Sequence, residues 1–349
     1  MNTLEQQLEL EVSTQPRPSS PRFIETMQAY QRTAAMKAAI ELDLFTAIGK
    51  TSGTVAEISQ HIKASERGVR ALCDFLVVMG FLSKYLDESE PRYSLTPDSA
   101  TFLDKASPNY VGIATRFLGS PFLTDAFRDL AAIVRAGGPL TRERSLDHEL
   151  PLWVDFAWGM APIMYPVSEQ AANLLRLGPE AKILDITASH GLFGIAVAKQ
   201  NPTAYIVALD FPSVLAVAKE NAERFGVSDR YSLLPGDALT IPFGNDFDAI
   251  LVPNILHQWD RPTIETFLKK VHASLKPGGQ VLIIEFAPND DRVSPPMPAS
   301  FVLNMLVNTT GGDAYPLSEL MQMLRNGAFV AVESHSLLPS PQTAIVGIK

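Results

Sequence analysis

The sequence of 349 residues contains one cysteine, Cys73. A single thiol forms neither an intrachain disulfide nor a zinc site built from several thiolates. The chain also lacks a run of about eighteen apolar residues, which a membrane-spanning helix needs. No basic N-terminal segment precedes an apolar stretch, the pattern of a secretory signal. These absences predict a cytoplasmic protein.

Positive charge is scarce, because 29 Lys and Arg stand against 38 Asp and Glu, giving a formal net charge of −9. Proteins that coat nucleic acid or anionic lipid need a basic surface, so we expect neither partner. Hydrophobic residues make up 46% of the chain and charged residues 19%. This balance predicts a folded protein with a large core, and the length predicts two domains.

The first 22 residues contain Gln, Ser, Thr and three prolines without periodicity, which predicts a mobile arm. Ordered structure should begin near Phe23. Apolar residues then recur every three or four positions over residues 23–48, the spacing of an amphipathic helix.

Two short helices and a hairpin are predicted next. Thr54 and Glu57 have the spacing of a capping box, and Ser65 can cap a following helix that ends at Gly80. The segments 81–86 and 92–96 flank an acidic turn and predict a hairpin. Together these elements predict a winged-helix domain over residues 23–106.

A winged helix raises the hypothesis of DNA binding. Between Arg22 and Lys105, however, ten basic residues are balanced by eleven acidic ones, and the hairpin is acidic. Few phosphate contacts are therefore available, and we favour packing and dimerisation. A ligand-responsive DNA-binding regulator stays the alternative from another functional class.

Residues 107–176 are predicted to form a helical linker. The stretch from Trp153 to Tyr165 holds more aromatic and methionine side chains than one buried helix face requires. We expect its surplus to line an apolar pocket. The residues assigned to that pocket are Trp153, Phe156, Met160 and Met164.

Strands and helices alternate from residue 177 to the end. Short apolar strands separated by helices of about ten residues predict an α/β fold with a doubly wound, mostly parallel sheet covered on both faces. Ligands bind such sheets at the carboxyl ends of the strands. The predicted strands are 181–186, 204–210, 231–235, 247–252, 280–286, 330–334 and 344–348; the helices are 192–200, 213–225, 262–275 and 318–326; and residues 276–279 are predicted as a turn.

Acidic residues mark three of the expected strand ends. Asp210 ends the second strand about twenty-five residues after Asp185, where the acid of dinucleotide folds binds the ribose hydroxyls. Asp237 follows the turn residue Gly236 and could accept a hydrogen bond from an adenine amino group. The alternative is that these acids only cap the helices that follow.

The loop after the first strand, residues 185–191, is poor in glycine. A pyrophosphate-binding loop needs a G-x-G-x-x-G pattern, whereas Ala188 and Ser189 bring side chains here and only Gly191 and Gly194 remain. This difference disfavours NAD or FAD. It favours a nucleoside cofactor with an amino-acid tail.

Six motifs distributed over the chain are typical of one family as a set. They are ILDITASHGLFGIAVA, ALDFPSVLAVAKENA, LPGDAL, ILVPNILHQWD, SLKPGGQVLIIEF and NTTGGDAYPLSEL. The region 181–286 resembles the cofactor domain of class I S-adenosylmethionine-dependent methyltransferases. The chain from about residue 23 resembles small-molecule O-methyltransferases, including plant caffeate-type and acetylserotonin-type enzymes and bacterial relatives. The resemblance implies a Rossmann-like domain over 177–349, S-adenosyl-L-methionine as cofactor, and a homodimer.

The resemblance also implies roles for individual residues. His257 would be the general base, and Glu285 would orient its ring. The family's second acid falls at Ala314, so it is absent or displaced onto Asp313. The residues implied for cofactor binding are Asp185, Ser189, His190, Gly191, Asp210, Phe211, Gly236, Asp237, Ala238 and Asn254.

Independent chemistry supports a basic role for His257. A histidine titrates near neutral pH and can remove a phenolic or enolic proton; the alternative is a structural histidine at a strand end. No spaced set of His and carboxylate ligands indicates a metal. The acceptor pocket is predicted to include Trp153, Phe156, Met160, Met164, Trp259, Phe301, Met305 and Asn308.

The sequence therefore predicts methyl transfer to a hydroxyl of an apolar small molecule. Because Ala314 replaces the second acid, a related reaction with the same cofactor stays open, either methylation of carbon or hydroxylase-like or pericyclic chemistry without methyl transfer. A binding protein without catalytic activity is a third possibility.

Overall fold

A computed structural model describes residues 20–51, 53–88, 90–141 and 149–349. The predicted mobile arm lies outside the described residues, except that residues 20–22 already belong to the first helix. The chain divides into two compact units, Met1–Pro108 and Asn109–Lys349. Within the described ranges, no helix has the length and apolar character needed to cross a membrane.

The N-terminal unit begins with helices rather than one continuous helix. The prediction of a single helix over residues 23–48 is wrong, because the chain turns at residues 28–29 and 42–43. Asp43 takes a left-handed conformation with φ of 54°, which no α-helix accommodates. The helices of this unit are α2 (Ser20–Met27), α3 (Tyr30–Glu41), α4 (Leu44–Lys50), α5 (Val55–Ile62), α6 (Glu66–Val78) and α7 (Pro97–Phe102).

The predicted helix caps and hairpin are confirmed. The Thr54 hydroxyl accepts a hydrogen bond from the Glu57 N–H, and the Glu57 carboxylate accepts one from the Thr54 N–H. The Ser65 hydroxyl caps α6 by accepting a hydrogen bond from the Gly68 N–H. Strands β1 (Leu82–Asp87) and β2 (Glu90–Leu95) then form an antiparallel hairpin, completing the winged helix.

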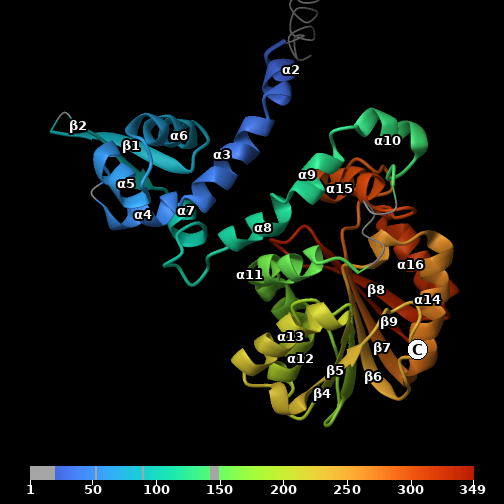
Figure 1. Cartoon of the computed structure of the whole chain (residues 1–349). Helices are drawn as coiled ribbons and strands as arrows, with labels where there is room; N and C mark the ends of the chain where they lie inside the picture. Colours follow the sequence, from blue (N-terminus) through green and yellow to red (C-terminus); the bar gives the residue numbers. More distant parts are fainter. Residues whose placement is uncertain (1–19, 52, 89, 142–148) are drawn as a thin grey trace, which may run out of the picture. The chain divides into compact units, whose positions relative to one another are not determined.

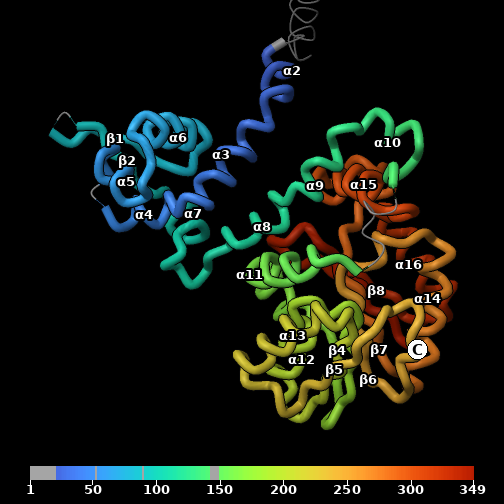
Figure 2. Tube along the Cα trace, viewed as in Figure 1, coloured from blue at the N-terminus to red at the C-terminus, as the bar shows by residue number. Residues whose placement is uncertain are grey.

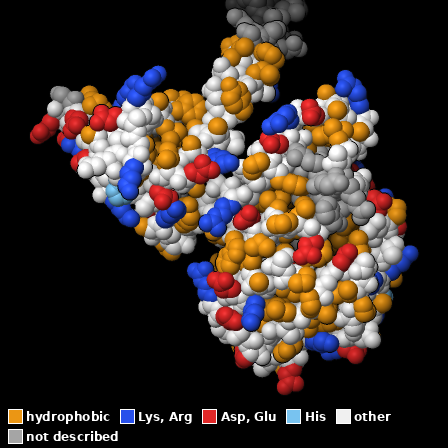
Figure 3. All heavy atoms as spheres, viewed as in Figure 1, with side chains coloured by type: hydrophobic (Ala, Val, Ile, Leu, Met, Phe, Trp, Pro, Cys, Tyr) orange, Lys and Arg blue, Asp and Glu red, His pale blue; other side chains and the backbone are white. Residues whose placement is uncertain are grey.

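Helix α2 and the first residue of α3 expose apolar side chains. Phe23 is 65% exposed, Met27 60% and Tyr30 69%, although their periodic spacing predicted a buried helix face. Figure 3 shows the hydrophobic side chains along α2. The core of the unit instead draws on α3 to β2, from Met36 onward.

The second unit opens with helices η1 (Gly112–Ala114), α8 (Thr115–Leu118), α9 (Pro121–Ala126), α10 (Leu130–Ala136) and α11 (Leu152–Ala172). The segment predicted as a helical linker thus belongs, from Asn109 onward, to the same compact unit as the sheet. Its longest helix, α11, carries the aromatic and methionine residues from Trp153 to Tyr165.

The sheet of this unit has the predicted mostly parallel, doubly wound arrangement (Figure 1). The strand order is β5-β4-β3-β6-β7-β9-β8; β9 is antiparallel to both of its neighbours, β7 and β8, and the other neighbouring pairs are parallel. The strands are β3 (Lys182–Ile186), β4 (Tyr205–Asp210), β5 (Tyr231–Pro235), β6 (Phe247–Pro253), β7 (Leu275–Glu285), β8 (Val330–Ser336) and β9 (Thr343–Ile348).

Helices cover both faces of the sheet (Figure 1). Helix α11 packs with α12 (Leu192–Gln200) and α13 (Pro212–Arg224) on one face, and α14 (Arg261–Ser274) packs with α16 (Leu317–Asn326) on the other. Successive strand residues alternate between the two cores. Because both faces are buried, the strands are almost continuously apolar.

Two elements differ from the prediction. Helix α15 (Pro296–Asn308) was not predicted, because its apolar residues surround the helix instead of forming one stripe. The predicted turn at 276–279 is part of β7. There the pairing with β6 shifts irregularly, and Gly278 takes a φ of 76°.

The C-terminal residue is tied to the same region. The Lys349 N–H donates to the Gly279 carbonyl at 2.9 Å, and its side-chain Nζ donates to the Leu275 carbonyl at 2.6 Å. The chain therefore ends beside the junction of α14 and β7 (Figure 2).

Candidate active site

A cavity of about 680 Å³ lies at the carboxyl ends of the central strands. It is lined by the loops that follow β3, β4, β5, β6 and β7, by α11 and α15, and by residues 339–342. The chain connectivity reverses between β3 and β6. This is the position at which open α/β sheets bind ligands.

The loop after β3 adopts the backbone of a glycine-rich loop although its sequence is poor in glycine. Thr187 and Ser189 have φ values of 53° and 52°, a left-handed conformation that costs a residue with a Cβ about 1 kcal/mol. Gly191 has a φ of 76°, and a Cβ there would lie 2.7 Å from the Tyr231 hydroxyl. Glycine is thus required only at the last of these positions.

Asp185 lies beneath this loop and does not line the cavity. Its side chain is fully buried, and Oδ2 accepts a hydrogen bond from the Gly194 N–H at 2.9 Å. Burial raises the pKa of Asp185 to about 8. Asp185 and Gly191 therefore shape the loop from behind, without the direct cavity contact that the sequence suggested.

Asp210 does line the cavity, at the end of β4. Its Oδ2 accepts a hydrogen bond from the Ser189 N–H at 2.8 Å, and its Oδ1 accepts one from the Phe211 N–H at 2.7 Å. Burial raises the pKa of Asp210 to about 6, although both backbone donors oppose this shift. Each carboxylate oxygen has a second lone pair and can accept another hydrogen bond.

Ser189 and His190 bring polar atoms to the same wall. The Ser189 hydroxyl is buried and has no hydrogen-bond partner in the described part of the chain. The His190 Nδ1 accepts a hydrogen bond from the Leu192 N–H at 3.2 Å, and burial lowers the pKa of His190 to about 4. His190 is therefore neutral at pH 7 and suited to contact rather than to proton transfer.

The other predicted cofactor residues also line the cavity: Phe211, Gly236, Asp237, Ala238 and Asn254. Asp237 is fixed at the rim because its Oδ1 accepts a hydrogen bond from the Leu239 N–H at 2.8 Å. Asn254 accepts a hydrogen bond from the side-chain amide of Gln342.

His257 and Glu285 form a buried pair, and His257 lines the cavity. The His257 Nδ1 lies 2.8 Å from Glu285 Oε2, and the His257 backbone N–H donates to Oε1 at 3.2 Å. Because a carboxylate accepts hydrogen bonds, Nδ1 carries the proton and Nε2 the lone pair. The ring also packs against the edge of Phe301, with centroids 5.0 Å apart. The imidazole is therefore held in one orientation and one tautomer.

The segment that would carry a second acid packs against His257 by its backbone. A Cβ at Gly312 would lie 2.2 Å from the His257 carbonyl oxygen. Asp313 instead pairs with Arg292, at 2.8 Å, and Ala314 is buried. Asp313 does not take over the role of the missing acid, and Glu285 is the acid that holds the His257 ring.

Apolar side chains form most of the remaining walls. The predicted residues Trp153, Phe156, Met160, Met164, Trp259, Phe301 and Met305 all line the cavity. Phe156 packs edge-on against Phe117, with centroids 4.9 Å apart. Asn308 does not line the cavity; it is fully buried and donates hydrogen bonds to Asn304.

Several lining residues were not predicted from the sequence, including Phe117, Gln170, Asn304, Phe286 and residues 339–342. Asn304 could have been found, because it lies one helical turn after Phe301 once α15 is recognised. No sequence motif marks the segment 339–342 as part of the cavity, since only the pairing of β9 beside β7 brings it there.

In the ranges described, no group of three His, Cys, Asp or Glu side chains could hold a metal ion.

Two family descriptions match the chain. Residues 151–329 match the O-methyltransferase domain, and residues 24–105 match the O-methyltransferase dimerisation domain. One match lies within each of the two compact units.

Individual proteins show the same similarity. The chain is 25% identical over 333 residues to the tetracenomycin polyketide synthesis 8-O-methyltransferase TcmO of Streptomyces glaucescens, covering 94% of this chain and 96% of the relative. A crystal structure from Nostoc punctiforme, described as a presumed O-methyltransferase, is 45% identical, has a TM-score of 0.91 and covers 96% of this chain and all of that one. Human N-acetylserotonin methyltransferase in complex with SAM shares the fold, with a TM-score of 0.83 at 20% identity and coverage of 96% and 99%.

Proposed function

The chain belongs to the family of S-adenosylmethionine-dependent O-methyltransferases, and we propose that it methylates a phenolic or enolic hydroxyl of an apolar small molecule, with His257 as general base. The His257–Glu285 pair carries this proposal. The carboxylate fixes Nδ1–H at 2.8 Å, so that Nε2 can accept a proton from an acceptor hydroxyl in the cavity.

The residues at the strand ends fit the cofactor. Asp210 has lone pairs available for two ribose hydroxyls, and Asp237 can accept from an adenine amino group. The unpartnered Ser189 hydroxyl, buried in the glycine-poor loop, suits the polar amino-acid tail. Phe211, Ala238, His190, Gly236 and Asn254 would complete this subsite, with Asp185 and Gly191 supporting it.

When bound, S-adenosylmethionine supplies an electrophilic methyl group on a positively charged sulfur. His257 removes the acceptor proton at Nε2, and the Glu285 carboxylate stabilises the imidazolium that forms. Trp153, Phe156 and Phe301 orient the acceptor and exclude water from the reacting oxygen. Because methyl transfer is a displacement, positioning and deprotonation are the protein's main contributions.

Replacing Glu285 with glutamine tests how far its charge matters. Glutamine keeps the size of the side chain, but its neutral amide cannot balance the charge of the imidazolium. The amide would also face both the His257 backbone N–H and the His257 Nδ1. We expect kcat to fall by about 10²-fold with little change in the cofactor Kd, measured by steady-state kinetics and calorimetry. An unchanged kcat would contradict the orienting role of Glu285.

Asp210 predicts a pH dependence of cofactor affinity. Its pKa is raised to about 6 by burial, and hydrogen bonds from ribose hydroxyls stabilise the charged form. Binding should therefore lower the pKa of Asp210, and the cofactor affinity should rise from pH 5 to pH 7. The total rise is up to about tenfold for each pH unit by which binding lowers this pKa. Calorimetry with S-adenosylhomocysteine measures this slope. A flat or falling affinity would show that Asp210 does not accept ligand hydrogen bonds.

The acceptor is best matched by a polycyclic phenol. The cavity walls are aromatic and apolar, and the Streptomyces glaucescens relative acts in polyketide synthesis. Release of S-adenosylhomocysteine is measured with a panel of polycyclic phenols and with the methyl ether of each. We expect turnover with phenols and none with the ethers, which lack the proton that His257 removes. Equal turnover with an ether would indicate attack at carbon, the principal rival reaction.

The N-terminal unit would form a homodimer. It matches the dimerisation domain, and Phe23, Ile24, Met27 and Tyr30 expose a large apolar surface (Figure 3). Such surfaces are typical of association. Sedimentation equilibrium should give twice the chain mass, and replacing Phe23 and Tyr30 with aspartate should weaken association. A monomeric wild-type protein at micromolar concentration would contradict this assignment.

A further inference from the structure

A lysine of helix α14 holds the turn that follows β5. The Lys270 Nζ donates a hydrogen bond to the Ala238 carbonyl at 2.9 Å and a longer one to the Leu239 carbonyl at 3.5 Å. Ala238 and Leu239 line the cavity beside Asp237, whereas Lys270 does not line it. Lys270 therefore contacts this wall of the cavity from behind.

Hydrogen bonds within the turn set its shape but not its position on the sheet. The Asp237 Oδ1 accepts a hydrogen bond from the Leu239 N–H at 2.8 Å. The Asp237 carbonyl accepts one from the Ile241 N–H at 3.1 Å. Among the residues that the structure describes, the hydrogen bonds that join residues 237–239 to another helix or strand come from Lys270. These bonds fasten the turn to α14.

Two further interactions fix the ammonium group of Lys270. It lies over the Phe243 ring, 4.0 Å from the centroid, and the buried Phe243 packs edge-to-face with Phe267. A cation over an aromatic face is attracted by the ring quadrupole, more strongly where water is excluded. Burial lowers the pKa of Lys270, and the negative charge of Asp237 opposes this shift. The ammonium therefore interacts with the backbone of the turn and with its carboxylate.

We propose that Lys270 is a positioning residue for the adenine of the cofactor, because it holds residues 237–239 where the Asp237 carboxylate meets the adenine amino group. This inference rests on the proposed function, in which Asp237 accepts a hydrogen bond from that amino group. The ribose is assigned to Asp210, at the end of a different strand. Loss of Lys270 should therefore weaken recognition of the amino group and leave recognition of the ribose intact.

Two ligands that differ at one position of the purine test the inference. S-adenosylhomocysteine carries the 6-amino group, and S-inosylhomocysteine carries a carbonyl oxygen in its place. Calorimetry measures both Kd values, so the readout does not depend on methyl transfer or on the acceptor. Wild-type protein should bind S-adenosylhomocysteine at least about tenfold more tightly, since the inosine compound lacks this hydrogen bond to a charged group.

Methionine and arginine at position 270 separate the role of the ammonium from that of its apolar stem. Lys270→Met keeps a chain of similar length but has no donor, so the two Kd values should come within about twofold of each other. Lys270→Arg keeps a positive charge and N–H donors, so most of the preference should return. In steady-state kinetics, Lys270→Met should raise the KM for S-adenosylmethionine more than it lowers kcat.

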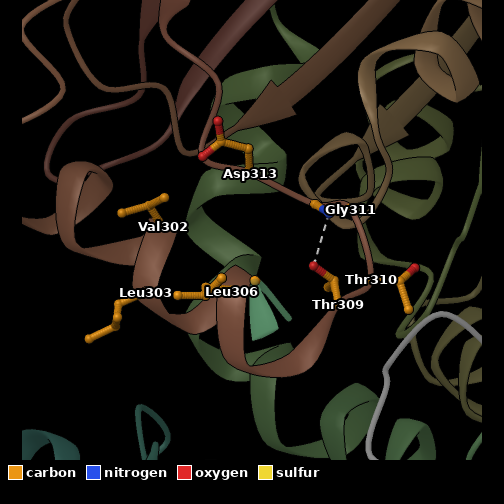
Figure 4. Close-up of a pocket in the computed structure, with 9 residues that line it drawn as sticks. Val302, Leu303, Leu306, Thr309, Thr310, Gly311 and Asp313 are labelled. Atoms are coloured by element: carbon orange, nitrogen blue, oxygen red, sulfur yellow. Dashed lines mark hydrogen bonds between the residues drawn. The ribbon is translucent and has the colours of Figure 1, made fainter. Parts of the chain in front are cut away.

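Two variants control for general effects on folding. Lys269 precedes Lys270 on α14 and is exposed, so Lys269→Met should keep the wild-type ratio of the two Kd values. Leu306 of α15 lines a separate cavity of about 240 Å³ beside residues 309–313 (Figure 4), and no residue of the turn 236–241 lines that cavity. Leu306→Ala should lower the melting temperature and also keep the wild-type ratio.

The outcomes separate this inference from the proposed function. A preference that Lys270→Met retains would overturn the inference and leave the proposed function intact. Loss of the preference in Leu306→Ala as well would also overturn it, because the ratio would then follow stability alone. A wild-type protein without any preference would contradict the assignment of Asp237 to adenine, and the inference would fall with it.

Discussion

Replacing His257 with alanine is expected to lower kcat by about 10²–10⁴-fold, the usual contribution of a positioned general base. His257 is 7% exposed and held by Glu285 through both Nδ1 and its backbone N–H. The backbone hydrogen bond survives the substitution, so the loop should keep its path. The Kd for the cofactor, measured by calorimetry, should change little.

The dependence on acceptor acidity separates a base from a positioning residue. A phenol that is already ionised at the assay pH has no proton to lose, so the defect of His257→Ala should shrink steadily as acceptors become more acidic. Added imidazole should restore part of the activity. His272→Ala is the control, because it removes a half-buried imidazole on α14 outside the cavity. A defect of the same size for neutral and ionised acceptors would show that His257 does not act as a base.

Replacing Asp210 with alanine is expected to weaken cofactor binding by about 10²-fold or more, because each hydrogen bond to a charged group contributes about 1.5–3 kcal/mol. The loss has two sources in the structure. The carboxylate is the proposed ribose partner, and it also holds the Ser189 and Phe211 N–H groups. Calorimetry with S-adenosylhomocysteine measures the effect directly.

A second acid on the sheet supplies the control for this variant. Asp248 lies at the amino end of β6, opposite the strand ends that line the cavity, where it pairs with Lys276 at 2.8 Å and accepts a hydrogen bond from the Lys182 N–H. Asp248→Ala should lower thermal stability and leave the cofactor Kd unchanged. If Asp210→Ala also left this Kd unchanged, the ribose assignment would be wrong.

Local signals predicted most of the fold. The capping box at Thr54 and Glu57 depends on contacts within one helical turn, which the sequence specifies directly. The strands of the large sheet are buried on both faces, so their apolar runs are unambiguous. The strand ends at Asp210 and Glu285 followed from those runs.

Features that depend on distant contacts were predicted less well. The periodic spacing of Phe23, Met27 and Tyr30 predicted burial, but all three are exposed in the single chain, because a helical pattern does not encode which other element, if any, covers the apolar face. Helix α15 has apolar residues on all sides, because one side faces the cavity and another faces α10. Its two asparagines therefore had no visible partners in the sequence.

The loop after β3 illustrates a third limit. Its missing glycines disfavoured a pyrophosphate-binding loop, yet Thr187 and Ser189 take left-handed backbone conformations. Residue type sets the energetic cost of such a conformation and does not forbid it. Packing around Gly191 and the hydrogen bond from the Ser189 N–H to Asp210 hold the loop in place.

The most direct test of the central claim follows the transferred group itself. The enzyme is incubated with a polycyclic phenol and S-adenosylmethionine carrying a ¹³C-labelled methyl group, and the product is examined by carbon NMR. The proposed function predicts one labelled methoxy group for each S-adenosylhomocysteine formed, and its rate should depend on His257. A label bonded to ring carbon, or a product formed without the label, would contradict methyl transfer to oxygen.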